Sequence, residues 1–178
     1  MGQTSFIHPA QGVLFAEGIS LEAIAKEFGT PTYVYSKNTL IQTFESFKKG
    51  LLKTDHLICF AVKANSNIAI LNLFASLGAG FDIVSGGELE RVIYAGGDPQ
   101  KIVFSGVGKT ESEIVVALKA NILCFNVESR SELTRIQEVA EKINIRASIS
   151  IRVNPDVDAK THPYISTGLK DNKFGVDF

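Results

Sequence analysis

The sequence predicts an α/β protein built around a parallel β-sheet, and three observations support that fold class. Short runs rich in Ile, Val and Phe alternate along the chain with segments of helical periodicity. The strand-like runs recur at intervals of roughly twenty residues, a spacing that accommodates a strand, a crossover helix and two loops. They are also apolar almost throughout, as in parallel sheets whose two faces are covered. Right-handed crossovers between such strands give a parallel sheet.

The predicted strands of this sheet lie at residues 56–62, 80–84, 102–104, 122–127 and 147–153. Each of the first four is followed by a signal for the start of a helix. For the first helix, Asn65 or Ser66 could provide the cap. The next three helices are predicted to begin with a capping box, in which a hydroxyl residue precedes a carboxylate by three positions. These pairs are Ser85 with Glu88, Thr110 with Glu113, and Ser129 with Glu132.

The N-terminal part of the chain stands apart from this repeating order. Residues 20–28 are predicted to form a short amphipathic helix, which Gly29 and Pro31 would end. Residues 32–35 are predicted to form a further short strand.

Two architectures use alternating parallel strands and helices, an open doubly wound sheet and an eight-stranded barrel. Five predicted strands suit the open sheet, because 178 residues are too few for every strand and helix of a barrel. Both architectures place their functional groups at the carboxyl ends of the strands. Candidate site residues are therefore expected there.

Composition and charge argue against several classes of function. With 18 basic and 19 acidic residues, the net charge is −1, which argues against a broad surface for nucleic acid. Every apolar run is shorter than the ~18 residues that a membrane span needs, and the N-terminus does not have the order of a signal peptide. A cytoplasmic protein without nucleic-acid or membrane partners is expected. Cys59 and Cys124 are expected to be buried, reduced thiols.

Motifs for nucleotide and metal binding fail when they are compared position by position. A P-loop ending at Lys109 and Thr110 lacks its first glycine, because Val103 occupies that position. A dinucleotide-binding fingerprint that begins at Gly78 lacks its third glycine, because Ile83 occupies that position. The three histidines are scattered without the spacing of metal ligands, so no metal is expected. Lys109 and Thr110 are interpreted instead as the start of a helix, with Thr110 as its cap.

A lysine and several other polar side chains follow the predicted strands. Lys63 comes directly after the first strand, and its small neighbours leave room beside its stem. A lysine in such a site can bind a carbonyl compound covalently, although a solvated lysine at the start of a loop is the alternative. The other polar residues at the same rim are Asp82, Ser105, Asn126, Glu128, Arg152 and Asn154.

Three parts of the sequence resemble the barrel-type decarboxylases and racemases that use pyridoxal 5′-phosphate. Residues 60–66 resemble the segment that carries the cofactor-binding lysine, and residues 78–88 resemble the second strand with its turn. Residues 152–168 and 173–175 are similar to the family members that convert meso-diaminopimelate to L-lysine and carbon dioxide in lysine biosynthesis. The resemblance runs from about residue 14 to residue 178.

This resemblance implies roles for individual residues. Pyridoxal 5′-phosphate would be bound covalently by Lys63, with Asp82 and Arg152 beside the cofactor and with Asn154 and His162 at the rim near the substrate. Asp82 could instead cap neighbouring amides, Arg152 could form a plain ion pair, and His162 could stabilise its own loop.

The resemblance also implies a domain organisation. Residues 1–36 would form a lead-in and part of a β-domain, and residues 37–178 would form the first part of a pyridoxal-phosphate-binding (β/α)8 barrel, with about five of its strand–helix units. Groups that the family takes from later strands and from its second domain have no counterpart here. A chain of these 178 residues alone is therefore expected to be inactive and to associate through its sheet edge. The full-length enzyme is expected to be a homodimer that acts on a small amino acid.

Other functions remain as alternatives. Within the family these are decarboxylases of ornithine, arginine or carboxynorspermidine, and alanine racemase, but residues 154–168 argue against them. A non-catalytic barrel protein that binds pyridoxal phosphate is disfavoured by the N-terminal extension at residues 12–35. An open-sheet nucleotide-binding protein is disfavoured by the two failed glycine motifs.

Overall fold

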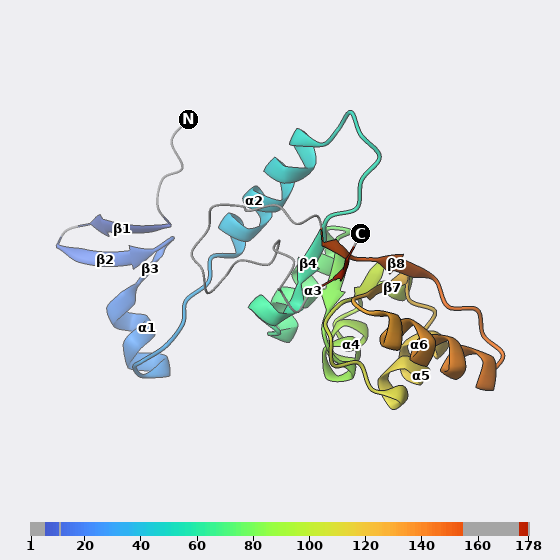
Figure 1. The fold of residues 1–178 in the computed structure, drawn as a ribbon. Helices are drawn as coiled ribbons and strands as arrows, with labels where there is room; N and C mark the ends of the chain where they lie inside the picture. The colour runs from blue at the N-terminus through green and yellow to red at the C-terminus, as the bar shows by residue number, and fades with distance from the viewer. Residues whose placement is uncertain (1–5, 11, 155–174, 178) are drawn as a thin grey trace. The chain divides into compact units, whose positions relative to one another are not determined.

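The computed structural model describes residues 6–10, 12–154 and 175–177 of the chain (Figure 1). The chain divides into two compact units, Met1–His56 and Leu57–Phe178. The domain boundary predicted between residues 36 and 37 concerns the organisation of the whole family protein and stays a prediction.

The first unit begins with an antiparallel sheet of β1 (Ile7–Ala10), β2 (Val13–Ala16) and β3 (Ile19–Ser20). Helix α1 (Leu21–Phe28) follows directly. The hydroxyl oxygen of Ser20 accepts a hydrogen bond from the Ala23 N–H at 3.2 Å and so caps the helix. Gly29 ends it with a φ of 78°, a backbone conformation that favours glycine. The helix predicted at residues 20–28 is confirmed.

Helix α2 (Lys37–Gly50) was not predicted from the sequence. Ser36 caps it by accepting a hydrogen bond from the Thr39 N–H at 2.9 Å. The Ser36 hydroxyl also donates to the carboxylate of Glu17, which accepts a second bond from the side chain of Asn38 at 2.9 Å. Glu17 thereby ties the turn between β2 and β3 to the positive end of the α2 dipole.

The strand predicted at residues 32–35 is wrong. The structure has no strand there, and the side chains of Tyr33 and Tyr35 are exposed, with their rings stacked at a centroid distance of 6.4 Å. The Thr, Tyr and Val residues of this segment favour extended backbone. They form no strand because none of the described strands pairs with the segment.

The second unit is built on a parallel sheet, and it confirms the predicted strands, most of them shorter than expected. The five strands are β4 (Cys59–Ala61), β5 (Gly80–Ile83), β6 (Ile102–Phe104), β7 (Cys124–Val127) and β8 (Ile149–Ile151). Four helices connect them: α3 (Ile68–Ser76), α4 (Gly86–Tyr94), α5 (Glu111–Lys119) and α6 (Arg130–Lys142).

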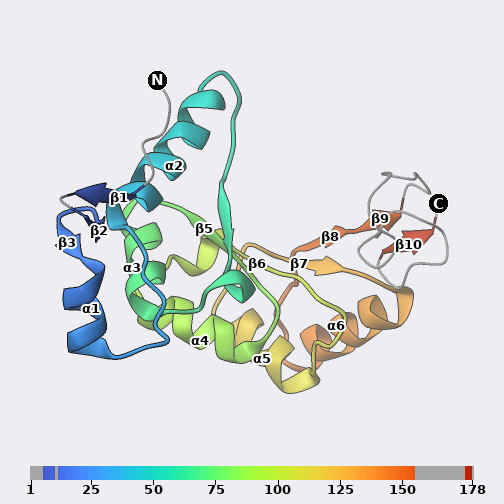
Figure 2. The same cartoon turned by 90° about the vertical axis from the view of Figure 1, so that its left-hand side faces the viewer.

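The order of the strands distinguishes between the two architectures that the sequence left open. The order in space is β4-β5-β6-β7-β8, the same as the order along the chain. Successive helices contact one another and follow the same side of the sheet (Figure 2). A doubly wound sheet reverses its strand order and carries helices on both faces. The second unit therefore has the arrangement of successive strand–helix units in a barrel wall.

The two faces of this sheet differ in chemistry. Side chains facing the helices are apolar and at most 1% exposed: Phe81, Ile83, Ile102, Phe104 and Phe125. Because side chains alternate along a strand, the opposite face carries the intervening residues. These are half-buried and mostly polar: Asp82, Val103, Ser105, Cys124 and Asn126. Because the helices cover a single face of the sheet, the opposite face has room for polar groups.

The predicted helix caps are correct for three helices and wrong for one. Ser85, Thr110 and Ser129 accept hydrogen bonds from backbone N–H groups at the starts of α4, α5 and α6. Helix α3 is capped by Asn67, not by Asn65 or Ser66. The reason is a 3-10 turn directly after β4, which delays the start of the helix.

The fifth predicted strand, at residues 147–153, is interrupted at Arg152. Beyond β8 the chain continues as β9 (Val153–Asn154), which pairs in parallel with β10 (Val176–Asp177). The Arg152 N–H donates to the carbonyl oxygen of Val127 at 2.9 Å, and its own carbonyl oxygen accepts from the Val176 N–H at 2.8 Å. The backbone of Arg152 therefore joins the two sheets. No helix among the described residues is long and apolar enough to cross a membrane.

Candidate active site

Lys63 lies where the sequence predicts it, at the carboxyl end of the first parallel strand. It occupies the 3-10 turn η1 (Val62–Ala64), directly after β4. Val62 is fully buried, whereas Lys63 is exposed. Within the part of the chain that the structure describes, the Lys63 amine has no hydrogen bond or ion pair. An amine without a competing partner at this position can be attached to a carbonyl compound.

Asp82 lies on the neighbouring strand and belongs to a hydrogen-bonded chain that crosses the sheet. The strand register pairs Asp82 with Ala61, two residues before Lys63. The Ser105 hydroxyl donates to Asp82 Oδ1 at 2.6 Å, and the Asn126 amide donates to Ser105 Oγ at 2.8 Å. These hydrogen bonds thus connect β5, the end of β6, and β7. The structure brings together three of the polar residues predicted at this rim.

The two cysteines are on the same face of the sheet as Asp82. Both thiols are free and half-buried. Burial raises the pKa of the Cys59 thiol, and the nearby carboxylate of Asp82 raises it further. Burial also raises the pKa of Cys124. Both thiols therefore remain protonated at neutral pH, which adds no negative charge beside Asp82.

Glu128 and Arg152 form an ion pair at the ends of β7 and β8. The Arg152 guanidinium nitrogen Nη1 donates to both carboxylate oxygens of Glu128 at 3.2 Å. The Glu128 side chain is 2% exposed and that of Arg152 is 42% exposed. Glu128 Oε1 also accepts a hydrogen bond from the Gly106 N–H at 3.3 Å. The ion pair given as an alternative for Arg152 is present, and contact of Arg152 with the cofactor stays a prediction.

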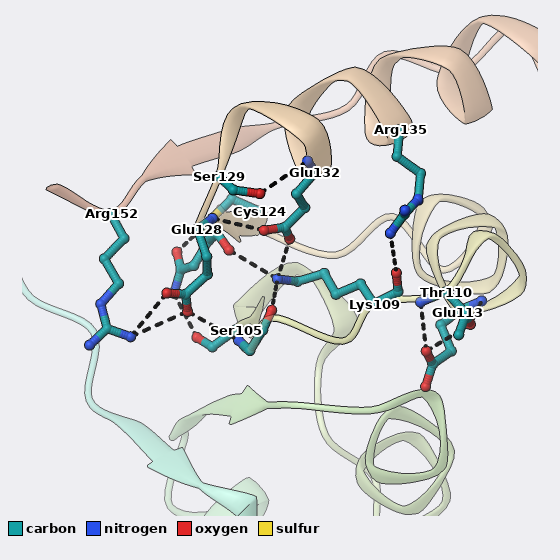
Figure 3. A network of polar contacts seen from close by, with 12 residues as sticks. Ser105, Lys109, Thr110, Glu113, Cys124, Glu128, Ser129, Glu132, Arg135 and Arg152 are labelled. Carbon is teal, nitrogen blue, oxygen red and sulfur yellow. Dashed lines mark hydrogen bonds and ion pairs between the residues drawn. The ribbon is translucent and has the colours of Figure 1, made fainter. Parts of the chain in front are cut away.

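A second ion pair, which the sequence analysis missed, lies directly beside the first (Figure 3). Helix α5 is capped by Thr110, as predicted, and Lys109, directly before this cap, is buried. Its amine lies 2.6 Å from Glu132 Oε1. The signal in the sequence was a lysine before one helix cap and a glutamate in the first turn of the next helix.

The starts of α4 and α5 are tied together in a related way. Glu113 Oε1 accepts a hydrogen bond from the Gly86 N–H at 2.8 Å, and Oε2 accepts one from the Thr110 N–H at 2.9 Å. These two bonds hold the pKa of Glu113 below its ordinary value, and the bond from Gly86 has the larger effect. Carboxylates in the first turns of successive helices therefore connect neighbouring strand–helix units at the same end of the sheet as the site.

Two further residues were predicted for the site, Asn154 and His162. Asn154 lies in β9 and is buried. His162 and most of the segment at residues 154–168 lie outside the described residues. Among the residues that are described, no group of three or more His, Cys, Asp or Glu side chains could hold a metal ion.

Comparison with known proteins gives the family. Residues 37–178 match the family described as pyridoxal-dependent decarboxylase, pyridoxal binding domain. The chain belongs to this family. The match covers the whole parallel sheet and includes the strand ends that carry Lys63, Asp82 and Arg152. It agrees with the cofactor and the fold class that the sequence analysis expected.

Relatives and solved structures agree with this assignment. The chain is 59% identical over 173 residues to diaminopimelate decarboxylase of Vibrio cholerae, covering 97% of this chain and 42% of the relative. It is 61% identical over 163 residues to the enzyme of Pseudomonas aeruginosa, and the match covers 92% of this chain and 39% of that relative. A crystal structure of diaminopimelate decarboxylase from Helicobacter pylori complexed with L-lysine has a TM-score of 0.84 at 52% identity. The match covers 88% of this chain and 40% of the chain in that structure. The chain thus spans about 40% of the length of these relatives.

Proposed function

We propose that this chain contributes the cofactor-binding part of an enzyme that converts meso-diaminopimelate to L-lysine and carbon dioxide. The observation that carries the proposal is Lys63, an exposed amine at the end of β4 in a domain of the pyridoxal-dependent decarboxylase family. Family membership supports a decarboxylation. The identity of about 60% to diaminopimelate decarboxylases supports this substrate.

The residues at the strand ends fit pyridoxal phosphate. Its aldehyde needs an amine, and the Lys63 amine has no competing partner among the described residues. Its negatively charged oxygens need donors, and the Arg152 guanidinium at the same rim is 42% exposed although it is held by Glu128. Asp82, fixed by Ser105, supplies a carboxylate on the strand next to that of Lys63. We assign Lys63, Asp82 and Arg152 to cofactor binding.

Bound pyridoxal phosphate supplies an electron sink for the electron pair that is left when the substrate carboxylate departs as carbon dioxide. The protein's part is to orient the reacting groups and to match their charges. Lys63 would attach the cofactor, and the hydrogen bond from Ser105 would hold the Asp82 carboxylate in one position beside it. Asn154 and His162 are proposed as rim residues near the substrate.

The choice of substrate rests on the relatives. The Helicobacter pylori structure contains L-lysine, the product of the proposed reaction. A lysine/ornithine decarboxylase of Vibrio vulnificus has a TM-score of 0.67 at 20% identity, a likeness that concerns the fold alone. The relatives with high identity therefore favour meso-diaminopimelate over ornithine. A homodimer and a cytoplasmic location belong to the same proposal, supported by the family resemblance.

A side-by-side assay tests the substrate. Release of carbon dioxide from meso-diaminopimelate, ornithine and arginine is measured with the full-length protein at saturating pyridoxal phosphate. We expect turnover of meso-diaminopimelate alone, and its loss in the Lys63→Ala variant. An exposed lysine of the first unit provides the matched control, because Lys53→Ala should retain activity. Faster turnover of ornithine or arginine would contradict the proposed substrate.

A further inference from the structure

We propose that Lys109 is a positioning residue of this site, which fixes the Arg152 guanidinium through Glu132 and Glu128. The inference rests on the proposed function, because it assumes that Arg152 contacts the cofactor. The four charged side chains follow one another across the ends of β6, β7 and β8 (Figure 3). Lys109 and Glu132 form one ion pair, and Glu128 and Arg152 form the other.

The surroundings of Lys109 exclude direct contact with a substrate. Its side chain is 0% exposed. The amine donates to the carbonyl oxygens of Gly106 at 2.6 Å and Asn126 at 3.0 Å, and to Glu132 Oε1 at 2.6 Å. These three bonds use all the donors of an ammonium group. With every N–H bonded inside the protein, the amine has no donor left for a substrate or cofactor.

Two routes of contact lead from Lys109 to Glu128. In the first, Glu132 accepts from Lys109 with Oε1 and from the Glu128 N–H with Oε2, at 2.8 Å. In the second, Lys109 holds the carbonyl oxygen of Gly106, whose N–H donates to the Glu128 carboxylate. Lys109 therefore restrains both the backbone and the carboxylate of Glu128. That carboxylate in turn holds Arg152.

Charge balance makes the same connection. The two ion pairs contain two buried carboxylates, Glu128 and Glu132, and two cations, Lys109 and Arg152. Without the amine of Lys109, the guanidinium of Arg152 would be the one cation left in the two ion pairs beside both carboxylates. Like charges in a buried site repel one another, so the Glu128 carboxylate would shift and Arg152 would lose its fixed position. The effect would reach the cofactor although Lys109 does not contact it.

A double-mutant cycle tests this role in the full-length protein. Binding of pyridoxal phosphate is measured by titration of its near-visible absorbance in the wild type, Lys109→Met, Arg152→Met and the double variant. We expect each single substitution to weaken binding roughly tenfold, and the double variant to bind as weakly as Arg152→Met alone, because residues in one network are not additive. Lys119→Met, an exposed lysine of α5, is the matched control and should bind like the wild type.

The result that overturns the role of Lys109 is additivity, with the double variant weakened roughly a hundredfold. If Lys109→Met does not fold, as shown by its thermal unfolding, Glu132→Gln takes its place in the cycle, with the exposed Glu138→Gln as control. Non-additivity of Glu132→Gln with Arg152→Met would then support the proposed role, and additivity would overturn it. A wild type that does not bind pyridoxal phosphate contradicts the proposed function itself, which keeps the two failures distinct.

Discussion

The hydroxyl of Ser105 donates to the carboxylate of Asp82 over 2.6 Å and so joins the ends of two neighbouring strands. The same hydroxyl accepts from the amide of Asn126, so one oxygen atom holds side chains from both flanking strands. Asp82 is thus fixed by residues that lie further along the sheet, on the side away from Lys63. This arrangement makes Ser105 the link between Asp82 and the rest of the rim.

Replacing Ser105 with alanine should loosen Asp82. We expect kcat/KM for meso-diaminopimelate to fall roughly tenfold, because loss of one bond to a charged group costs on the order of 1.5 kcal/mol or more. Steady-state kinetics of the full-length protein check this. Ser148→Ala, an exposed serine of the same unit, is the control. Unchanged kinetics in Ser105→Ala would contradict a role for the hydroxyl in holding Asp82.

Protonation of Glu113 should destabilise the second unit in acid. Its pKa is lowered from the ordinary value of 4.5, chiefly by the bonds from Gly86 and Thr110. A group whose pKa is lower in the folded state contributes stability above its unfolded value, and this contribution is lost as the pH falls through the folded pKa. The Glu113→Gln variant should therefore be less stable than the wild type at neutral pH, and the difference should shrink below about pH 4.5.

Denaturant unfolding as a function of pH measures that difference. Glu90→Gln on α4 is an exposed carboxylate with the same charge change, and it should leave the free energy of unfolding almost unchanged at every pH. A difference between wild type and Glu113→Gln that stayed constant into acid would show that the carboxylate charge is not what stabilises the two helix starts.

Two glycines of the second unit should respond in opposite directions to substitution by alanine. A Cβ atom at Gly80 would lie 2.5 Å from the carbonyl oxygen of Lys101 and 2.8 Å from the sulfur of Cys59. Because the nearest atom is backbone, Gly80→Ala should cost about 1–3 kcal/mol of stability. At Gly87, in the first turn of α4, a Cβ atom would meet nothing within 4 Å. Gly87→Ala should be neutral or stabilising by up to about 1 kcal/mol.

Equilibrium unfolding of both glycine variants checks this pair. A stable Gly80→Ala protein would mean that the backbone at Gly80 is not as close to Lys101, directly before β6, and to Cys59 of β4 as the structure shows.

The strand ends were predictable because the sequence marks them locally. Three apolar runs predicted the sheet, and the polar residues Lys63, Asp82 and Ser105 at or near their ends predicted its polar rim. Parallel strands bring their carboxyl ends to one edge of a sheet. The capping hydroxyl of Thr110 was equally local. What the sequence could not indicate is which polar residues would meet. The pairing of Lys109 with Glu132 depends on two neighbouring loops closing over the same buried space.

One error depends on contacts that are distant along the chain, and two others are local. Residues 32–35 have the composition of a strand but no pairing partner among the described strands. Asn67 displaced the predicted caps because the turn that carries Lys63 delays helix α3. Helix α2 has a local signal in the sequence, because Ser36 can cap it and Leu40 and Phe44 have helical spacing.

The identity of the lysine that binds the cofactor is the central claim, and covalent trapping tests it most directly. The full-length protein is loaded with pyridoxal phosphate, reduced with borohydride and digested, and the modified peptide is identified by mass spectrometry. We predict an adduct on Lys63 that is absent in Lys63→Ala and retained in Lys53→Ala. An adduct confined to a different lysine, or none in a loaded wild type, would contradict the assignment of the cofactor to the end of β4.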